Sequence, residues 1–247
     1  GAPIAMLGMI GGLLTPALIQ SDTPNAQMLF LYLYVVLAGL FTVIRMKDWW
    51  FISIPVVLGT FLWVILWMST SYVPSDSLCI GLFLIAVSGT IVFHSKKAME
   101  QQAPESLRQF SLFSSLNYLS LGGSVILMSA VAAKAHFGEM EWGLFWLLAA
   151  GGLILSYFNQ KLYGFVPWVS LGMTVLMMAV WNGMPDSILY TLLAFGLLYA
   201  LSAYWCMWRS NNPFSWALLC AGSPFLYYLL AYGKFHYWFT DKLLFSQ

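Results

Sequence analysis

Long apolar stretches, separated by short polar or charged segments, recur along the whole chain. An α-helix rises about 1.5 Å per residue, so a hydrocarbon core about 30 Å thick requires roughly 20 apolar residues. Nine stretches approach or reach that length: 2–19, 26–44, 49–68, 77–93, 110–133, 142–158, 162–181, 188–208 and 213–232. They are too long and too uniformly apolar for barrel strands. Only helices and closed barrels satisfy backbone groups in lipid. The pattern therefore predicts an all-α polytopic transmembrane helix bundle of about nine spans, in one domain over residues 1–247.

The basic residues alternate between the predicted loops. With nine spans, one side of the membrane receives seven of the ten basic residues: Arg45, Lys47, Lys96, Lys97, Arg108, Lys161 and Arg209. The opposite loops hold only Lys134, and Lys234 and Lys242 lie in the C-terminal tail. The positive-inside rule places the basic side in the cytoplasm. We therefore expect a cytoplasmic residue 1, a cytoplasmic loop at 94–109 and an external tail after 232. Residues 236–244 could begin a tenth span.

Composition narrows the function classes. Hydrophobic residues make up 61% of the chain and charged residues only 8%, whereas soluble proteins carry about 25% charged residues. The formal net charge is +1, which leaves no basic surface for nucleic acid. Membrane lipids are the expected partners, together with other membrane subunits or further spans of a longer chain.

Candidate catalytic chemistry is sparse. No Asp, Glu, Lys, Arg or His lies at the centre of a predicted span, where such residues commonly mark an ion path. The three cysteines and three histidines form no metal-binding motif, so we expect no cofactor and no metal and name no catalytic residue. Glu139 and Glu141 could act as paired carboxylates. Such residues are more often solvated and complement a helix N-terminus, and we favour that interpretation.

Polar and small residues suggest where helices meet. In the fifth span, Ser114, Asn117 and Ser124 share one helical face. That face predicts either the wall of a polar cavity or interhelical hydrogen bonds, and the second is favoured.

Pairs of glycines at 11–12, 122–123 and 151–152 are typical of closely packed spans. Gly/Pro interruptions at Pro16, Pro167 and Pro224 can mark broken helices at transporter sites or simple kinks. The candidate lining or packing positions are Gly11, Gly12, Pro16, Asn117, Ser124, Pro167, Gly222 and Pro224.

The N-terminal fifth of the chain carries a family pattern. Residues 8–19 read GMIGGLLTPALI, then come Asn25, the aromatic run LFLY at 29–32 and the turn RMKDWW at 45–50. This pattern resembles the bacterial membrane-protein family named domain of unknown function 2339, which shows a GG-x-x-TP element. The resemblance covers about residues 8–50. It implies a longer multi-pass protein of the bacterial inner membrane, with further spans before residue 1, and no established activity.

Three functions compete on this evidence. The first is permease-like handling of a neutral, apolar or lipid-like substrate, which Gly/Pro-interrupted helices without buried charges would fit. The second is a non-enzymatic structural or assembly subunit of a cell-envelope membrane complex. The third is a membrane-embedded transferase that acts on a lipid headgroup, for which Glu139 and Glu141 are the nearest candidates. We expect no enzymatic activity.

Overall fold

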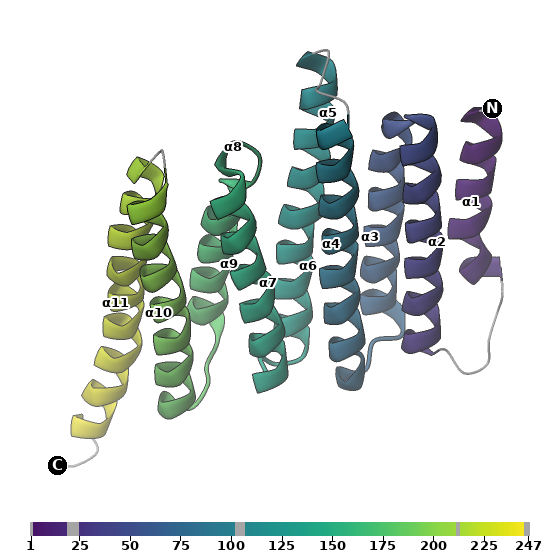
Figure 1. The fold of residues 1–247 in the computed structure, drawn as a ribbon. Helices are drawn as coiled ribbons and strands as arrows, with labels where there is room; N and C mark the ends of the chain where they lie inside the picture. The colour runs from purple at the N-terminus through teal and green to yellow at the C-terminus, as the bar shows by residue number, and fades with distance from the viewer. Residues whose placement is uncertain (1, 19–24, 102–106, 211–212, 245–247) are drawn as a thin grey trace. The chain divides into compact units, whose positions relative to one another are not determined.

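Helices are the only regular elements in the described part of the computed structural model, which comprises residues 2–18, 25–101, 107–210 and 213–244 (Figure 1). Eight of these helical segments are long and apolar enough to cross a membrane. A ninth apolar helix, α1 (Ala2–Leu18), has 17 residues, and Ile19 at the end of the first predicted span lies outside the described residues. The all-α, polytopic architecture is confirmed.

The chain divides into two compact units, and each is described by itself. The first, Gly1–Phe145, contains α1 and α2 (Ala26–Lys47), then the short η1 (Trp50–Ile52) with α3 (Ser53–Thr70), and η2 (Pro74–Asp76) with α4 (Ser77–Gln101). It continues with α5 (Leu107–Asn117), the π-helical turn η3 (Tyr118–Gly122) and α6 (Gly123–Lys134), and it ends in the first part of α7 (Glu139–Phe158).

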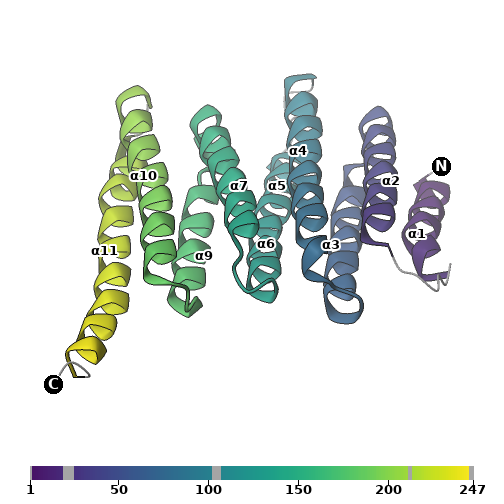
Figure 2. The ribbon, with the colours of Figure 1, turned by 90° about the horizontal axis from the view of Figure 1, so that it is seen from below.

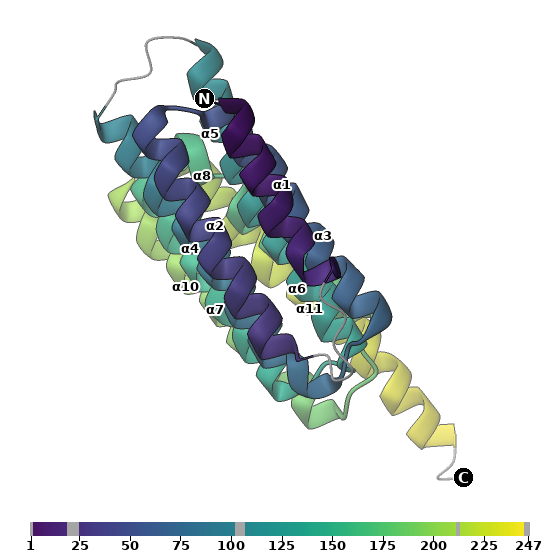
Figure 3. The ribbon, with the colours of Figure 1, turned by 90° about the vertical axis from the view of Figure 1, so that its right-hand side faces the viewer.

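Within the first unit, α2 and α4 pack side by side, and α3 packs against α6. Helices α3 and α6 lie behind α2 and α4 in Figure 1 and on the lower side in Figure 2. Helix α1 lies against α2 and α3, and the helices run alongside one another (Figure 3). The buried core of this unit is made of large apolar side chains such as Phe30, Phe41 and Phe145.

The second unit, Trp146–Gln247, holds the rest of α7, then α8 (Gln160–Tyr163), α9 (Val166–Val180), α10 (Pro185–Arg209) and α11 (Pro213–Leu244). Helices α10 and α11 pack along much of their length, and α9 contacts both. Phe195 and Tyr199 of α10 are fully buried between them.

Local chemistry sets many helix ends. The Asn25 side chain accepts a hydrogen bond from the Met28 amide at 3.2 Å and so caps α2. Asp48 adopts a left-handed conformation, with φ of 56°, and ends the same helix. Proline lies in the first turn of α9 and of α10, where its missing N–H costs nothing.

The structure corrects the predicted cytoplasmic loop at 94–109. Helix α4 continues to Gln101 and α5 begins at Leu107, so most of that segment is helical, and residues 102–106 lie outside the described residues. Lys96 and Glu100 form an ion pair one turn apart, with 3.9 Å between Nζ and Oε1. Such pairs favour a helix even where the sequence is too polar for a membrane core.

Two other predicted spans have unexpected boundaries. The seventh is interrupted, because α8 ends at Tyr163 and α9 starts at Val166. The last continues, since α11 runs without a break to Leu244, and residues 236–244 extend it rather than form a tenth span. Its 32 residues correspond to about 48 Å, more than a bilayer core requires.

Candidate functional site

A line of buried polar side chains joins α4 to the α5–α6 segment, and we call it the α4–α6 seam. Its members are Ser88, Ser95, Asn117, Ser120 and Ser124, and each is at most 3% exposed. Asn117 Nδ2 donates to Phe113 O at 2.8 Å and to Ser95 Oγ at 3.2 Å. Ser88 Oγ donates to Ser124 Oγ at 2.8 Å. Side chains thus fill the seam, and it bears no formal charge.

The π-helical turn η3 lies in the middle of this seam. Short π-helical turns inside α-helices often occur at functional sites. Ser120, in this turn, has a buried hydroxyl without a hydrogen-bond partner. A buried polar group of this kind is rare in folded proteins and requires an explanation. The turn therefore places an unsatisfied hydroxyl inside the most buried of the candidate spans, Ser111–Lys134, which is 56% buried.

A second group of hydroxyls lies between α9, α10 and α11 in the other unit, and we call it the α9–α11 hydroxyl cluster. Its members are Ser170, Thr174, Tyr199, Ser223 and Tyr227, all buried. Thr174 Oγ1 donates to Ser170 O at 2.6 Å and lies 3.5 Å from the Tyr199 hydroxyl. The rings of Tyr199 and Tyr227 stack with centroids 6.3 Å apart. The buried hydroxyl of Ser223 has no hydrogen-bond partner.

None of the residues of this cluster is among the positions predicted from the sequence. Its signal was present, because Ser170 and Thr174 are one helical turn apart on α9, and Ser223 and Tyr227 are one turn apart on α11. Each pair alone is weak evidence. Only the packing of α9 and α11 on α10 shows that the two pairs converge near Tyr199.

Glu141 lies in a different environment from the one expected. It is only 5% exposed and accepts a hydrogen bond from the Ser77 hydroxyl, whereas Glu139 is exposed. The expectation of two solvated glutamates is therefore wrong for Glu141. The contact joins the start of α4 to the start of α7, so a structural role explains the buried carboxylate.

Two other charged residues, Asp76 and Lys134, form hydrogen bonds near the Glu141 end of the first unit. Asp76 accepts from Trp67 Nε1 at 2.9 Å and from the Val73 amide at 3.2 Å. Lys134 Nζ donates to Met68 O and lies 5.5 Å from the centre of the Tyr72 ring. Burial of Tyr72, together with the negative charges of Glu141 and Asp76, raises the pKa of its phenol above the usual value. The described residues include no group of three or more acidic, histidine or cysteine side chains that could hold a metal ion.

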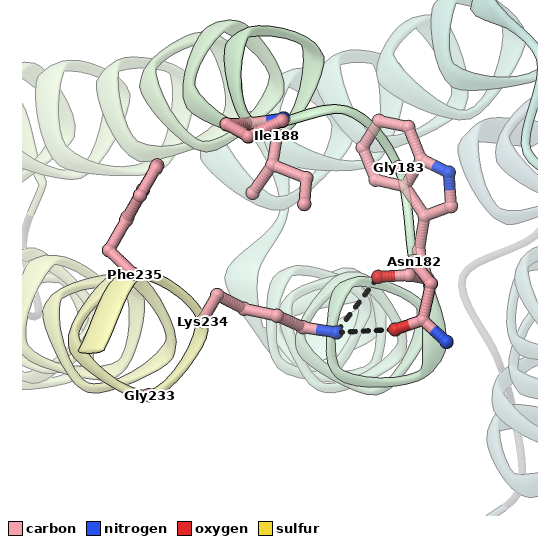
Figure 4. A pocket seen from close by; sticks show the side chains of 8 residues that line it. Asn182, Gly183, Ile188, Gly233, Lys234 and Phe235 are labelled. Carbon is pink, nitrogen blue, oxygen red and sulfur yellow. Dashed lines mark hydrogen bonds between the residues drawn. The ribbon is translucent and has the colours of Figure 1, made fainter. Parts of the chain in front are cut away.

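A pocket of about 460 Å³ opens at one end of the second unit. It is lined by Trp181, Asn182, Gly183, Pro185, Ile188, Gly233, Lys234 and Phe235. Figure 4 shows Lys234 extending from α11 toward Asn182, with Ile188 of α10 on the opposite side of the space. Lys234 Nζ donates to Trp181 O at 2.8 Å and to Asn182 Oδ1 at 3.5 Å.

Each glycine pair has a member at a close contact with another helix. A Cβ atom on Gly12 would lie 3.2 Å from Val36 Cγ1, and one on Gly123 or Gly152 would collide with Phe61 or Val166. By contrast, a Cβ atom on Gly11 or Gly151 would have no neighbouring atom within 4 Å, and the same holds for the single glycine Gly222. Small residues therefore permit close helix packing at Gly12, Gly123 and Gly152.

The eight candidate positions lie on five helices, three of them in the first unit and two in the second. Gly11, Gly12 and Pro16 lie on α1, which continues through Pro16. Asn117 and Ser124 share the α4–α6 seam. Pro167 occupies the first turn of α9 rather than a mid-helix kink. Gly222 and the exposed Pro224 lie within α11, beside the buried Ser223.

Comparisons with known proteins agree with the fold. Searches of curated proteins and of solved structures gave no match. The family model described as Predicted membrane protein (DUF2339) matches residues 1–239, a much longer segment than the pattern at residues 8–50. The matched segment includes the α4–α6 seam, the α9–α11 hydroxyl cluster and the pocket at Lys234. This multi-pass membrane chain therefore belongs to the DUF2339 family of predicted membrane proteins.

Proposed function

We propose that this chain acts as a permease-like protein for a neutral, apolar or lipid-like substrate. The observation that carries the proposal is that each cluster contains a buried hydroxyl without a hydrogen-bond partner, Ser120 in the α4–α6 seam and Ser223 in the α9–α11 hydroxyl cluster. An unpaired polar group in a low-dielectric interior costs about 1–3 kcal/mol. A substrate that offers a hydrogen bond would recover that free energy during passage.

The character of the two clusters specifies the substrate class. Both the α4–α6 seam and the α9–α11 hydroxyl cluster consist of hydroxyl and amide groups without formal charge. A charged substrate would meet no side chain of opposite charge in either cluster. A neutral molecule with hydroxyl, ester or ether oxygens, including a lipid-like one, matches these groups in polarity and can use the unpaired donors.

The proposal is tested in proteoliposomes that contain the full chain. The probes are phosphatidylcholine with a fluorescent nitrobenzoxadiazole label, followed by dithionite quenching, and glycerol, followed by vesicle swelling. We expect the wild-type chain to accelerate at least one of these processes several-fold over empty vesicles. Failure to accelerate either process would contradict the proposed permeation of these neutral substrates.

Tyr227→Phe separates a functional from a structural hydroxyl. If the hydroxyl serves the substrate, the variant should slow the accelerated process several-fold while the melting temperature changes little, because the Phe ring fills the same space as the Tyr ring. The matched control is Tyr228→Phe, next in sequence and 65% exposed. Unchanged flux in Tyr227→Phe would refute the assigned role.

A structural or assembly subunit is the second candidate. The supporting observation is the apolar ridge of Leu189, Leu193, Leu197 and Leu201, spaced by four on α10 and 43–63% exposed. Lipid chains or helices of another subunit would cover such a ridge. Cysteine at Leu197 should crosslink to another chain in native membranes if this function is correct, and crosslinking to no protein would oppose it.

We also propose that the protein resides in the bacterial inner membrane, with the residue 1 end in the cytoplasm and the tail outside. The charge distribution between loops supports this orientation.

A further inference from the structure

Lys234 carries a positive charge whose described partners are neutral. Its ammonium donates to the Trp181 carbonyl at 2.8 Å and, over a longer 3.5 Å, to the Asn182 amide oxygen. An ammonium group has three N–H donors, so at least one donor remains for another acceptor. Among the described residues, no carboxylate forms an ion pair with Lys234.

The pocket beside this ammonium has two chemical sides. Asn182 and Lys234 line it with polar atoms, and Ile188 and Phe235 line it with apolar surface (Figure 4). Its volume, about 460 Å³, lies in the range typical of small-ligand sites, about 300–1,000 Å³. A ligand with an anionic group and an adjoining apolar part fits both sides.

The pocket lies beside the end of the apolar helix α9, the level at which a membrane-spanning helix meets the lipid headgroups. Helix α9 ends at Val180, directly before Trp181, and the carbonyl of Trp181 is the one that accepts from Lys234. Tryptophan and lysine are enriched at this level because each combines an apolar body with a polar end. A headgroup phosphate can therefore reach the ammonium while acyl chains stay in the hydrocarbon.

We propose that this pocket binds the phosphate group of an anionic amphiphile, with Lys234 as the charged ligand. The site is separate from the hydroxyl clusters and does not depend on the permease-like function. Because Lys234 also contacts the carbonyl that follows α9, an occupied pocket should strengthen the attachment of α11 to the end of α9.

The test measures binding to the full chain in a neutral detergent, by titrating the melting temperature with three probes. These are phosphatidylglycerol, phosphatidylcholine and inorganic phosphate. We expect phosphatidylglycerol to raise the melting temperature at lower concentration than phosphatidylcholine. In Lys234→Gln, apparent affinity for phosphatidylglycerol should fall about tenfold, as for loss of one charge-assisted hydrogen bond. Lys234→Arg should retain most of the affinity.

Two further variants distinguish a built site from general electrostatics. Lys161→Gln removes the same charge from the same unit, at an exposed position on α8, and should leave affinity unchanged. Gly233→Leu keeps Lys234 but adds bulk at a lining position where a new Cβ meets no atom within 4 Å. It should weaken lipid binding without lowering stability in the absence of lipid.

Each outcome decides the proposal. A loss of affinity for phosphatidylglycerol in Lys234→Gln and Gly233→Leu, but not in Lys161→Gln, supports the proposal. If inorganic phosphate has no effect on the melting temperature, the bound phosphate group is that of a lipid. If inorganic phosphate raises the melting temperature as much as phosphatidylglycerol does, and Lys234→Gln abolishes this rise, the same site binds free phosphate. The proposal is overturned if Lys161→Gln lowers the affinity for phosphatidylglycerol as much as Lys234→Gln does, or if Lys234→Gln does not lower it.

Discussion

Asn117 and Ser95 connect α5 to α4 inside the first unit, with 3.2 Å between Asn117 Nδ2 and Ser95 Oγ. Both side chains are fully buried, and Asn117 also donates to the Phe113 carbonyl of its own helix. The amide of Asn117 thus hydrogen-bonds both a side chain of the neighbouring helix and a carbonyl of its own helix. Such bonds in membranes contribute about 0.6 kcal/mol each.

Replacing Asn117 should therefore weaken the first unit. Asn117→Leu keeps the branched shape of the side chain but leaves the Ser95 hydroxyl without this partner, and we expect a loss of about 1–2 kcal/mol in the free energy of unfolding. Thermal unfolding of the full chain in detergent measures the effect. The control is Ser115→Leu, on the exposed face of α5, which should change little. Equal melting temperatures for Asn117→Leu and the wild type would contradict the role of the seam.

Gly12 should tolerate a side chain less well than Gly8. A Cβ on Gly12 would approach Val36 Cγ1 to 3.2 Å, whereas one on Gly8 would meet no atom within 4 Å. Gly12→Leu should therefore push α1 away from α2 and lower the melting temperature by several degrees. Gly8→Leu, on the same helix, should not. The prediction is wrong if Gly12→Leu and Gly8→Leu have the same melting temperature.

The predicted orientation can be tested by chemical labelling. In a background where the native cysteines are replaced, Lys96→Cys and Glu139→Cys place thiols on exposed side chains of α4 and α7. An impermeant maleimide added to intact cells should label Glu139→Cys alone, because the seven-to-one distribution of basic residues places Lys96 inside. Labelling of both from one side would refute the nine-span arrangement.

Any flux through this chain should be insensitive to pH between about 6 and 8. No Asp, Glu, Lys, Arg or His lies at the centre of a span, so no such group there can gain or lose a proton during transport. Tyr72 also remains protonated in this interval, because its phenol pKa is raised above the ordinary value of about 10. Proteoliposome flux measured across this interval, with and without a protonophore, checks the prediction. Collapse of flux on adding the protonophore would contradict it.

Local sequence was sufficient for most helices and for the burial of the fifth span. Twenty apolar residues in succession have few alternatives to a helix in lipid, and Asn117 with Ser124 could not face hydrocarbon without a penalty. The extension of α4 through Lys96 and Glu100 was not foreseen. Hydropathy measures transfer into lipid, whereas helix propensity and one-turn ion pairs act equally well beyond the membrane.

The sequence by itself therefore determined the all-α architecture, because backbone groups in lipid must be paired within each segment. Tertiary structure decided which polar groups meet. Thr174, Tyr199 and Tyr227 come from three different helices, and no local pattern encodes their convergence. It likewise decided that Glu141 is buried against Ser77 and that Lys234 reaches Trp181 across 53 positions of sequence. Helix pairing depends on small differences in side-chain packing and hydrogen bonding, since lipid provides no hydrophobic force between helices.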